Sequence, residues 1–393
     1  MLNSKRAVAA VVLFFAGNGF PIGVYAASIP TLTARFDITA LQLSAFFISN
    51  GLFAIASMQV SGRLADRIGA RRVALATLVP LVAAVPLIVL APSYGWLFLG
   101  GALLGIGNGG IDVAMNALGV QVEKARPKPI MSFFHGMWSV GNLAGAASIV
   151  LLGFVFADDA DATILAAALI TSVILVVVLA VNWRLSPDTE PVVHVDDTGA
   201  KTKIPPIAYL MGVMAISFGL GEGTAADWSS QHVTQIAQVP PTVGALGVTA
   251  VSAFMVVIRL LGDLLVARFG RRAIVVFGGV CSTLGYLVVS TMSTLPLLLV
   301  GWSLVGLGVG LIAPQVYAVA GHTAGGRGLA VVVTFGYAAF LICPAIIGAA
   351  VHGFGIQHAM FVPAVLLLGL VVLARFLPPR ETADVAVEAE AAV

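Results

Sequence analysis

A short charged stretch, Gly62-Arg-Leu-Ala-Asp66-Arg67-Ile-Gly69-Ala-Arg71-Arg72, lies between two long runs without charge, residues 38–62 and 73–111. A helix that crosses a bilayer needs about 20 predominantly apolar residues, so the second run is long enough for two. Hydrophobic residues make up 59% of the chain and charged residues 10%, whereas a water-soluble domain carries about a quarter charged residues. The stretch therefore indicates a polar turn between spanning helices, and a net charge of +2 gives no reason to expect nucleic-acid binding.

Further uncharged runs predict the remaining spans, at 7–34, 129–157, 162–183, 204–221, 228–258, 273–326 and 328–374. The run 204–221 is expected to continue through Glu222 and Asp227 to about His232. The three longest runs are each expected to hold two helices, with breaks at residues 91–95, at Ser293-Thr294 and between His352 and His358. The sequence thus predicts an all-α membrane protein of twelve transmembrane helices.

The basic residues predict the orientation, because lysine and arginine are retained on the cytoplasmic side. Arg35 alone falls on one predicted side, while Arg259 lies within a span. The opposite side holds Lys5, Arg6, Arg63, Arg67, Arg71, Arg72, Lys124, Arg126, Lys128, Arg184, Lys201, Lys203, Arg268, Arg271, Arg272, Arg327, Arg375 and Arg380. Both termini are therefore expected to be cytoplasmic, in a multi-pass protein of the inner (plasma) membrane.

An internal repeat divides the chain. At an offset of 201, Gly69 corresponds to Gly270, and Gly105 and Gly107 correspond to Gly306 and Gly308. The expected organisation is a six-helix bundle (1–185), a cytoplasmic linker (186–204), a second six-helix bundle (205–380) and a disordered acidic tail (381–393). Parallel repeats place a binding site between the halves, near the membrane midplane.

The stretch from Gly62 to Arg72 resembles the signature loop of the major facilitator superfamily. Its second copy, around Arg268-Phe-Gly270-Arg271-Arg272, keeps the glycine and the basic pair but lacks Asp-Arg in register. The resemblance implies transport by alternating access, with charges that lock the cytoplasmic side in the outward-open state. That gating role is carried to Asp66, Arg67, Arg71, Arg259 and Asp263, and anchoring of the topology is the alternative. Arg259 and Asp263, four residues apart, are expected to pair.

The fourth predicted span carries Asn108, Asp112 and Asn116 at steps of four, so all three share one helix face. Asp112 lies close to the midplane, where a carboxyl group favours its neutral form and can exchange a proton with each change of access. The arrangement resembles the fucose permease-like branch of the superfamily, in which an acidic residue on this helix couples sugar entry to protons. A structural carboxylate, bonded to neighbouring side chains, is the alternative.

The fifth predicted span places His135, Ser139 and Asn142 on one face, next to Trp138. Amide groups bond hydroxyls and an aromatic face stacks on a sugar ring, so His135, Trp138 and Asn142 are predicted to contact a polyhydroxylated solute. His135 has the alternative role of an interhelical hydrogen-bonding group.

The seventh predicted span carries Glu222, which is predicted to be a second proton site or a solute contact. A solvated carboxylate in the outer vestibule is the alternative. Asp227-Trp228 is expected nearer the outer interface, where tryptophan is favoured. Further polar residues of the spans are predicted to line the solute path together with Asn108 and Asn116: Asn18, Tyr25, Asn50 and Gln315.

Two motif matches are rejected. Gly105-Ile-Gly107-Asn-Gly-Gly110 fits the dinucleotide-binding pattern, but it lies inside a span with no preceding strand. Gly136 and Gly145 have the spacing of the drug-antiporter signature without its Gly-Pro. No metal-binding or nucleophile motif is present, so neither an enzyme nor a cofactor is expected.

The sequence therefore predicts a monomeric secondary transporter that takes up a sugar or another small polar solute together with protons. A proton-driven exporter of drugs or metabolites is the first alternative. A membrane receptor without net flux is the second.

Overall fold

The computed structural model describes residues 2–126, 130–157, 159–188 and 204–377, except for a few side chains within helices. All regular elements of this part of the chain are helices. In chain order they are α1 (Lys5–Phe36), α2 (Ala40–Ile68), α3 (Ala70–Val89), α4 (Tyr94–Lys124), α5 (Met131–Val155), α6 (Ala160–Leu185), α7 (Pro206–Ala237), α8 (Pro241–Gly244), α9 (Leu246–Phe269), α10 (Arg271–Thr291), α11 (Leu295–Ala359) and α12 (Phe361–Ala374).

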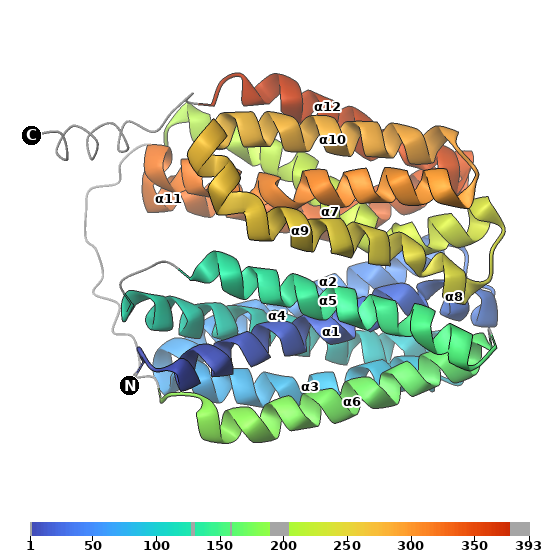
Figure 1. The fold of residues 1–393 in the computed structure, drawn as a ribbon, viewed down its shortest axis with the longest axis horizontal. Coiled ribbons are helices and arrows are strands. Elements are labelled where there is room, and N and C mark those ends of the chain that lie inside the picture. The colour runs from blue at the N-terminus through green and yellow to red at the C-terminus, as the bar shows by residue number, and fades with distance from the viewer. Residues whose placement is uncertain (1, 127–129, 158, 189–203, 378–393) are drawn as a thin grey trace, which may run out of the picture.

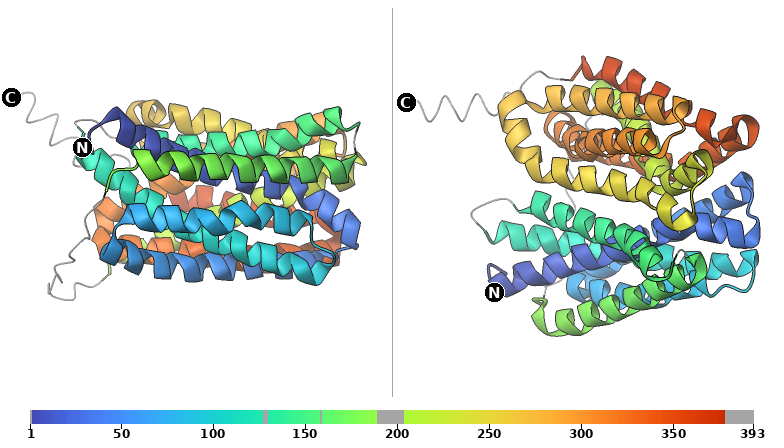
Figure 2. Two further views of the ribbon diagram at one scale, coloured as in Figure 1. Left: turned by 90° about the horizontal axis from the view of Figure 1, so that it is seen from below. Right: turned by 45° about the vertical axis from the view of Figure 1, so that its right-hand side comes forward.

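The helices form two groups that lie side by side, α1–α6 below and α7–α12 above in Figure 1. Within each group the long helices run roughly along one common direction, as the views of Figure 2 also show. We call the end of the molecule where α1 begins the basic face and the end where α1 stops the Arg35 face. The short helix α8 lies between the groups at the Arg35 face, where it contacts α1, α5 and α6.

The described residues hold eleven helical segments that are long and apolar enough to cross a membrane. Two of these, Leu295–Gly321 and Gly328–Ala359, belong to α11. A Cβ at Gly321 would lie 3.8 Å from a Leu329 methyl group, whereas eight residues of straight helix span about 12 Å. This short distance indicates that the chain reverses between the two segments. The predicted twelfth span corresponds to α12, which has only 14 residues.

Most of the predicted helix breaks are confirmed, and one is wrong. The chain leaves the helix between α3 and α4 and again between α10 and α11, as expected. The third break was expected between His352 and His358, but α11 continues to Ala359 and the interruption falls at Met360. Gly355 lies in the expected interval and has a φ of 80°, yet the helical hydrogen bonds continue past it.

The internal repeat at an offset of 201 residues is also visible in the backbone conformation. Gly69 and Gly270 end α2 and α9 with φ values of 89° and 80°, a conformation that favours glycine. Their N–H groups donate to Ala65 and Val266, which are also 201 residues apart. The predicted parallel repeat is therefore visible at the turn that follows the second helix of each half.

The glycine pairs inside the spans repeat in the same way. A Cβ at Gly105 would come closer than 3 Å to the carbonyl oxygen of Asn50, and one at Gly306 would do the same at Val251. These glycines let α4 approach α2, and α11 approach α9, backbone to backbone. Helix packing, rather than dinucleotide binding, thus accounts for this glycine-rich motif.

Arg35 connects three helix ends at its own face. Its Nη1 donates to the Val89 carbonyl at 2.5 Å, and its Nε donates to Asp161 Oδ1 at 2.9 Å. The side chain, predicted as the lone basic residue of this side, thereby holds the ends of α1, α3 and α6 together.

Candidate functional site

The guanidinium of Arg259 connects both halves of the protein. Its Nη2 pairs with Glu222 Oε1 of α7 at 3.2 Å, and its Nη1 donates to Ser139 Oγ of α5 at 2.8 Å. Its Nε donates to the carbonyl oxygen of Gly310 in α11 at 3.2 Å. The Arg259 and Glu222 side chains are only 15% and 19% exposed, so each charge depends on the other.

Arg259 also has partners that were not predicted for it. It was assigned to a gate and paired with Asp263, whose side chain lies outside the described part of the structure. Its observed partners, Glu222 and Ser139, come instead from the helices that were predicted to line the solute path. We call Arg259, Glu222 and Ser139 the central cluster.

The predicted polar face of α5 extends this cluster. His135 packs edge-on against Phe15 of α1, with ring centroids 5.2 Å apart, and lies within electrostatic range of Arg259. One turn beyond Ser139, Asn142 Oδ1 accepts a hydrogen bond from Ser252 Oγ of α9 at 2.7 Å. The α5 face thus meets the opposite half, whereas the backbone of Trp138 lies against Gly19 of α1.

Asp112 lies in a second group of polar residues, still at the boundary between the halves. The Asn116 amide donates to the Asp112 backbone carbonyl at 2.8 Å and to its carboxylate at 3.3 Å. Tyr337 of α11, in the other half, lies within electrostatic range of this carboxylate. Asp112 has no salt-bridge partner among the described residues.

The remaining predicted path residues do not form one lining. Gln315 accepts from Arg271 Nη1 at 2.8 Å, near the basic face. Asn18 is 1% exposed, and neither atom of its amide group has a described hydrogen-bond partner. Asn50 lies at the crossing of α2 and α4, and Asn108 is half-buried on α4.

The predicted gate residues of the signature loop lie at the basic face. Arg71 donates to Asp188 Oδ1 at 2.7 Å and to the Trp183 carbonyl at 2.5 Å, and both of these partners belong to the first half. Asp66 is half-buried near the end of α2, and Arg67 is exposed. Their gating role stays a prediction.

The halves are in close contact toward the Arg35 face. Phe47 of α2 packs edge-on against Trp228 of α7, with ring centroids 5.9 Å apart. A Cβ at Gly348 would come closer than 3 Å to the Ser44 hydroxyl of the other half. Trp228, expected nearer the outer interface, is 1% exposed, because it forms part of this contact between the halves.

Polar side chains on the other side of the central cluster are accessible. His135 and Tyr337 are exposed, although each lies close to a charged group of the opposite half. Tyr25 and Trp228, on the Arg35 side, are buried. The described contacts thus close the Arg35 face, whereas His135 and Tyr337 are exposed on the other side of the central cluster.

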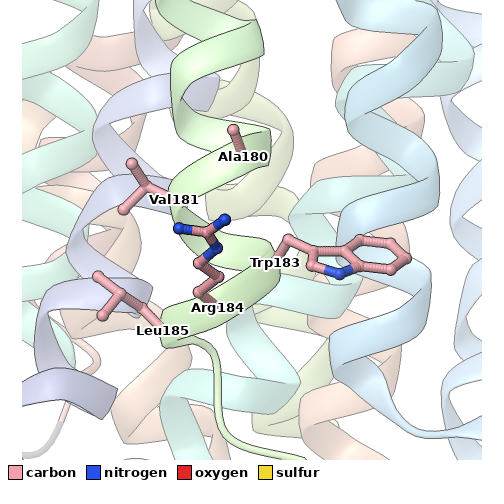
Figure 3. Close-up of a pocket in the computed structure, with 5 residues that line it drawn as sticks. All are labelled: Ala180, Val181, Trp183, Arg184 and Leu185. Atoms are coloured by element: carbon pink, nitrogen blue, oxygen red, sulfur yellow. The ribbon is translucent and has the colours of Figure 1, made fainter.

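The surface hollow in Figure 3 is not part of this site. It is lined by Ala180, Val181, Trp183, Arg184 and Leu185, all at the end of α6. Trp183 points away from Val181 and Leu185, so the hollow follows the outside of one helix instead of separating the halves.

Two residues near the site were not predicted: Ser252 and Tyr337. Ser252 precedes Arg259 by seven residues, so helical spacing places both on one face of α9 and provided a usable signal. Tyr337 had no such signal, since its neighbour Asp112 is on a distant segment of the chain.

Replacing Ser252 with alanine is expected to favour opening of the Arg35 face by about 1 kcal/mol, or roughly fivefold, because the buried Asn142 oxygen loses its donor. The rate at which a thiol reagent modifies a Ser44→Cys reporter measures this opening. Ser172→Ala is the control, because the Ser172 hydroxyl donates to the Val82 carbonyl within one half. Equal labelling rates in the two variants would contradict the expectation.

Comparison with known proteins follows the same division of the chain. The family model of the Major Facilitator Superfamily matches residues 10–221 and again residues 207–392. The uncharacterized transporter y4wD of Sinorhizobium fredii is 31% identical over 379 residues, which cover 95% of this chain and 98% of that protein. An uncharacterized MFS-type transporter of Yersinia pestis is 28% identical, with 95% of each chain covered.

The membrane protein MosC of Rhizobium meliloti is 26% identical over 94% of this chain and 89% of its own. Among solved structures, the nucleoside transporter NupG matches with a TM-score of 0.73 at 11% identity, covering 93% of this chain and 98% of that one. The human organic anion transporter MFSD10 matches with a TM-score of 0.66 at 14% identity, covering 94% and 99%. The chain is a multi-pass membrane transporter that belongs to the major facilitator superfamily.

Proposed function

We propose that this transporter takes up a sugar or another small polar solute together with protons, by alternating access between the two halves. Asp112 carries the proton. The solute binds between α4, α5, α7 and α9, where the residues around the central cluster supply hydroxyl, amide, imidazole and aromatic groups. The proposed protein has twelve spans and lies in the inner membrane of the cell. Its basic face is on the cytoplasmic side.

The setting of Asp112 is the observation that supports proton coupling. Its carboxylate lies deep in α4 and faces a tyrosine of the opposite half, with an amide and no described cation as its nearest partner. A charged carboxylate in a membrane span is costly unless it is paired or hydrated. Such a group gains a proton when its surroundings close and can release it when they open to water.

The polar groups of α5 support a neutral or weakly charged polar solute. Ser139 and Asn142 already bond residues of the other half, so a hydroxylated solute can replace these contacts one for one. The charges of Arg259 and Glu222 cancel each other, which leaves no net charge in the central cluster to attract a strongly ionic solute.

Asp112→Asn is expected to abolish solute-dependent proton movement. With lightly buffered vesicles, a panel of sugars and small polar metabolites is added outside, and the external pH is followed. The native chain is expected to make the outside more alkaline with one solute, whereas the variant stays at background. Asp37→Asn is the matched control, because Asp37 is exposed at the end of α1 in a left-handed conformation that asparagine also adopts.

Other outcomes exclude parts of the proposal. Solute flux without proton movement in the native chain would contradict the coupling role of Asp112 and leave a facilitator. Acidification of the outside during release of a preloaded solute would indicate proton-coupled export. A solute that binds without flux in any direction would contradict transport of that solute.

A further inference from the structure

Asp227 is a carboxylate in a span that the proposed function does not use. It lies in α7, five residues beyond Glu222 and so about 7.5 Å farther toward the Arg35 face. Within the described part of the chain, its carboxylate forms no salt bridge and accepts no hydrogen bond. Glu222, by contrast, is paired with Arg259.

Two residues next to Asp227, one in space and one in sequence, have buried polar groups without described partners. Tyr25 of α1 lies within electrostatic range of it, and the Tyr25 hydroxyl is buried without a hydrogen bond of acceptable geometry, although the Asn50 amide lies beside it. The indole N–H of Trp228, the next residue in α7, is also buried without a partner. Each unsatisfied buried group costs about 1 to 3 kcal/mol, so this arrangement calls for a ligand that changes the hydrogen bonding.

The aromatic residues around Asp227 join the two halves. Phe47 of α2 packs edge-on against Trp228 and, with a centroid distance of 6.5 Å, against Tyr25. All three side chains are at most 6% exposed. We call Tyr25, Phe47 and Trp228 the aromatic plug. Any opening of the Arg35 face that parts α2 from α7 has to separate this plug and admit water to Asp227.

A charged Asp227 is disfavoured while the plug is closed, because its side chain is then only partly exposed. A carboxylate removed from water without a cation pays a large desolvation cost, whereas the neutral acid pays only that of a polar group. The neutral acid also gains an O–H donor, and the Tyr25 hydroxyl can accept it. When the Arg35 face opens, water hydrates the carboxylate, so the charged form of Asp227 becomes the more stable one.

We propose that Asp227 is a second proton-binding site, and that proton binding there closes the Arg35 face. The groups near Asp227 are neutral at neutral pH: Tyr25 comes from α1 and Cys343 from α11. Asn50 and Phe47 of α2, which lie beside Tyr25, carry no charge. On α7 itself, the charge of Glu222 is compensated by Arg259. Asp227 is therefore the group in this cluster whose charge changes with pH.

The sign of the pH dependence follows from linkage. The closed state binds one proton more than the open state, so raising the pH favours opening, by up to about tenfold per pH unit. This equilibrium involves neither a solute nor Asp112, so it does not rest on the proposed symport.

The test uses two proteins, each with one added reporter cysteine, in the purified full-length chain. Ser44→Cys is buried at the contact between the halves, and Ser93→Cys is exposed at the same face whatever the conformation. The ratio of their labelling rates by a maleimide removes the intrinsic pH dependence of thiol reactivity. Labelling of the native cysteines, Cys281 and Cys343, is measured in the parent protein and subtracted.

With Asp227 in place, the ratio of Ser44→Cys labelling to Ser93→Cys labelling is expected to rise with pH. Asp227→Asn is expected to keep the ratio low and independent of pH, because its neutral amide mimics the protonated acid. Asp227→Glu retains the acid and is expected to retain the pH dependence, which separates titration from misfolding. Asp37→Asn controls for the loss of an acidic residue elsewhere at this face.

A ratio in Asp227→Asn that rises with pH as steeply as in the parent would overturn the proposal. A labelling ratio that does not change with pH while Asp227 is in place would also overturn it. Failure of solute-coupled proton movement in the Asp112 experiment would leave this result unaffected, because no solute is present here.

Discussion

Arg259→Met is expected to abolish transport and to lower the free energy of unfolding by about 3 to 5 kcal/mol, since it leaves the Glu222 charge buried without a partner. It also removes the hydrogen bonds to Ser139 and to the Gly310 carbonyl, so α9 loses one of its polar contacts with α5 and keeps the one from Ser252 to Asn142. Thermal unfolding in detergent measures the stability, and solute flux in vesicles measures transport.

The double variant Arg259→Met with Glu222→Met separates charge from packing. Removing both partners is expected to recover most of the lost stability without recovering transport, because apolar pairs replace buried ion pairs at little cost. Arg72→Met, at an exposed position of the basic face, controls for the loss of one arginine. If the double variant is no more stable than Arg259→Met, the pairing with Glu222 is not the source of the loss.

Gly141→Ala is expected to destabilise the protein by about 3 kcal/mol, at the upper end of the range for overpacking. A Cβ at Gly141 would come closer than 3 Å to the backbone carbonyl of Ala16, and Gly145 meets Phe20 in the same way. From α1, Gly19 and Gly23 meet the carbonyls of α5. The two backbones are therefore interlocked, and one added methyl group forces them apart.

Gly369→Ala is the matched control, because a Cβ there would meet nothing within 4 Å. In the helix α12 this change is expected to be neutral or to stabilise by up to about 1 kcal/mol. Unfolding midpoints of the two variants provide the comparison. Similar midpoints would contradict the interlocking of α1 and α5, and a displaced α5 would also show as reduced solute affinity.

Much of the fold was predictable because lipid limits the possible structures. The thickness of the hydrocarbon region sets the length of each apolar run, and a continuous apolar run of that length satisfies its backbone hydrogen bonds as a helix. Gly69 and Gly270 marked the repeat because a positive φ favours glycine. The last helix break was misplaced, since the polar residues around Gly355 resemble a loop although the helix persists to Ala359.

The site was less predictable, because helical periodicity describes one helix at a time. It identified the α5 face of His135, Ser139 and Asn142, which does meet the other half. It also predicted a pair between Arg259 and Asp263, whose side chain lies outside the described residues, and it did not predict the observed pair with Glu222, 37 positions away. Sequence spacing contains no information on such pairs between helices.

The polar residues of α7 also bear on how the protein is made. Of the eleven candidate spans, α7 has the least apolar core segment, and a charged residue such as Asp227 adds about 2.5 to 3.5 kcal/mol to the cost of inserting a helix. Its most extensive packing partner is α11, which the ribosome completes only after α8, α9 and α10. A nascent chain that ends before α11 can already pair Glu222 with Arg259 of α9, but it lacks the main packing partner of α7. The second half can therefore complete its packing only after α11 has been made.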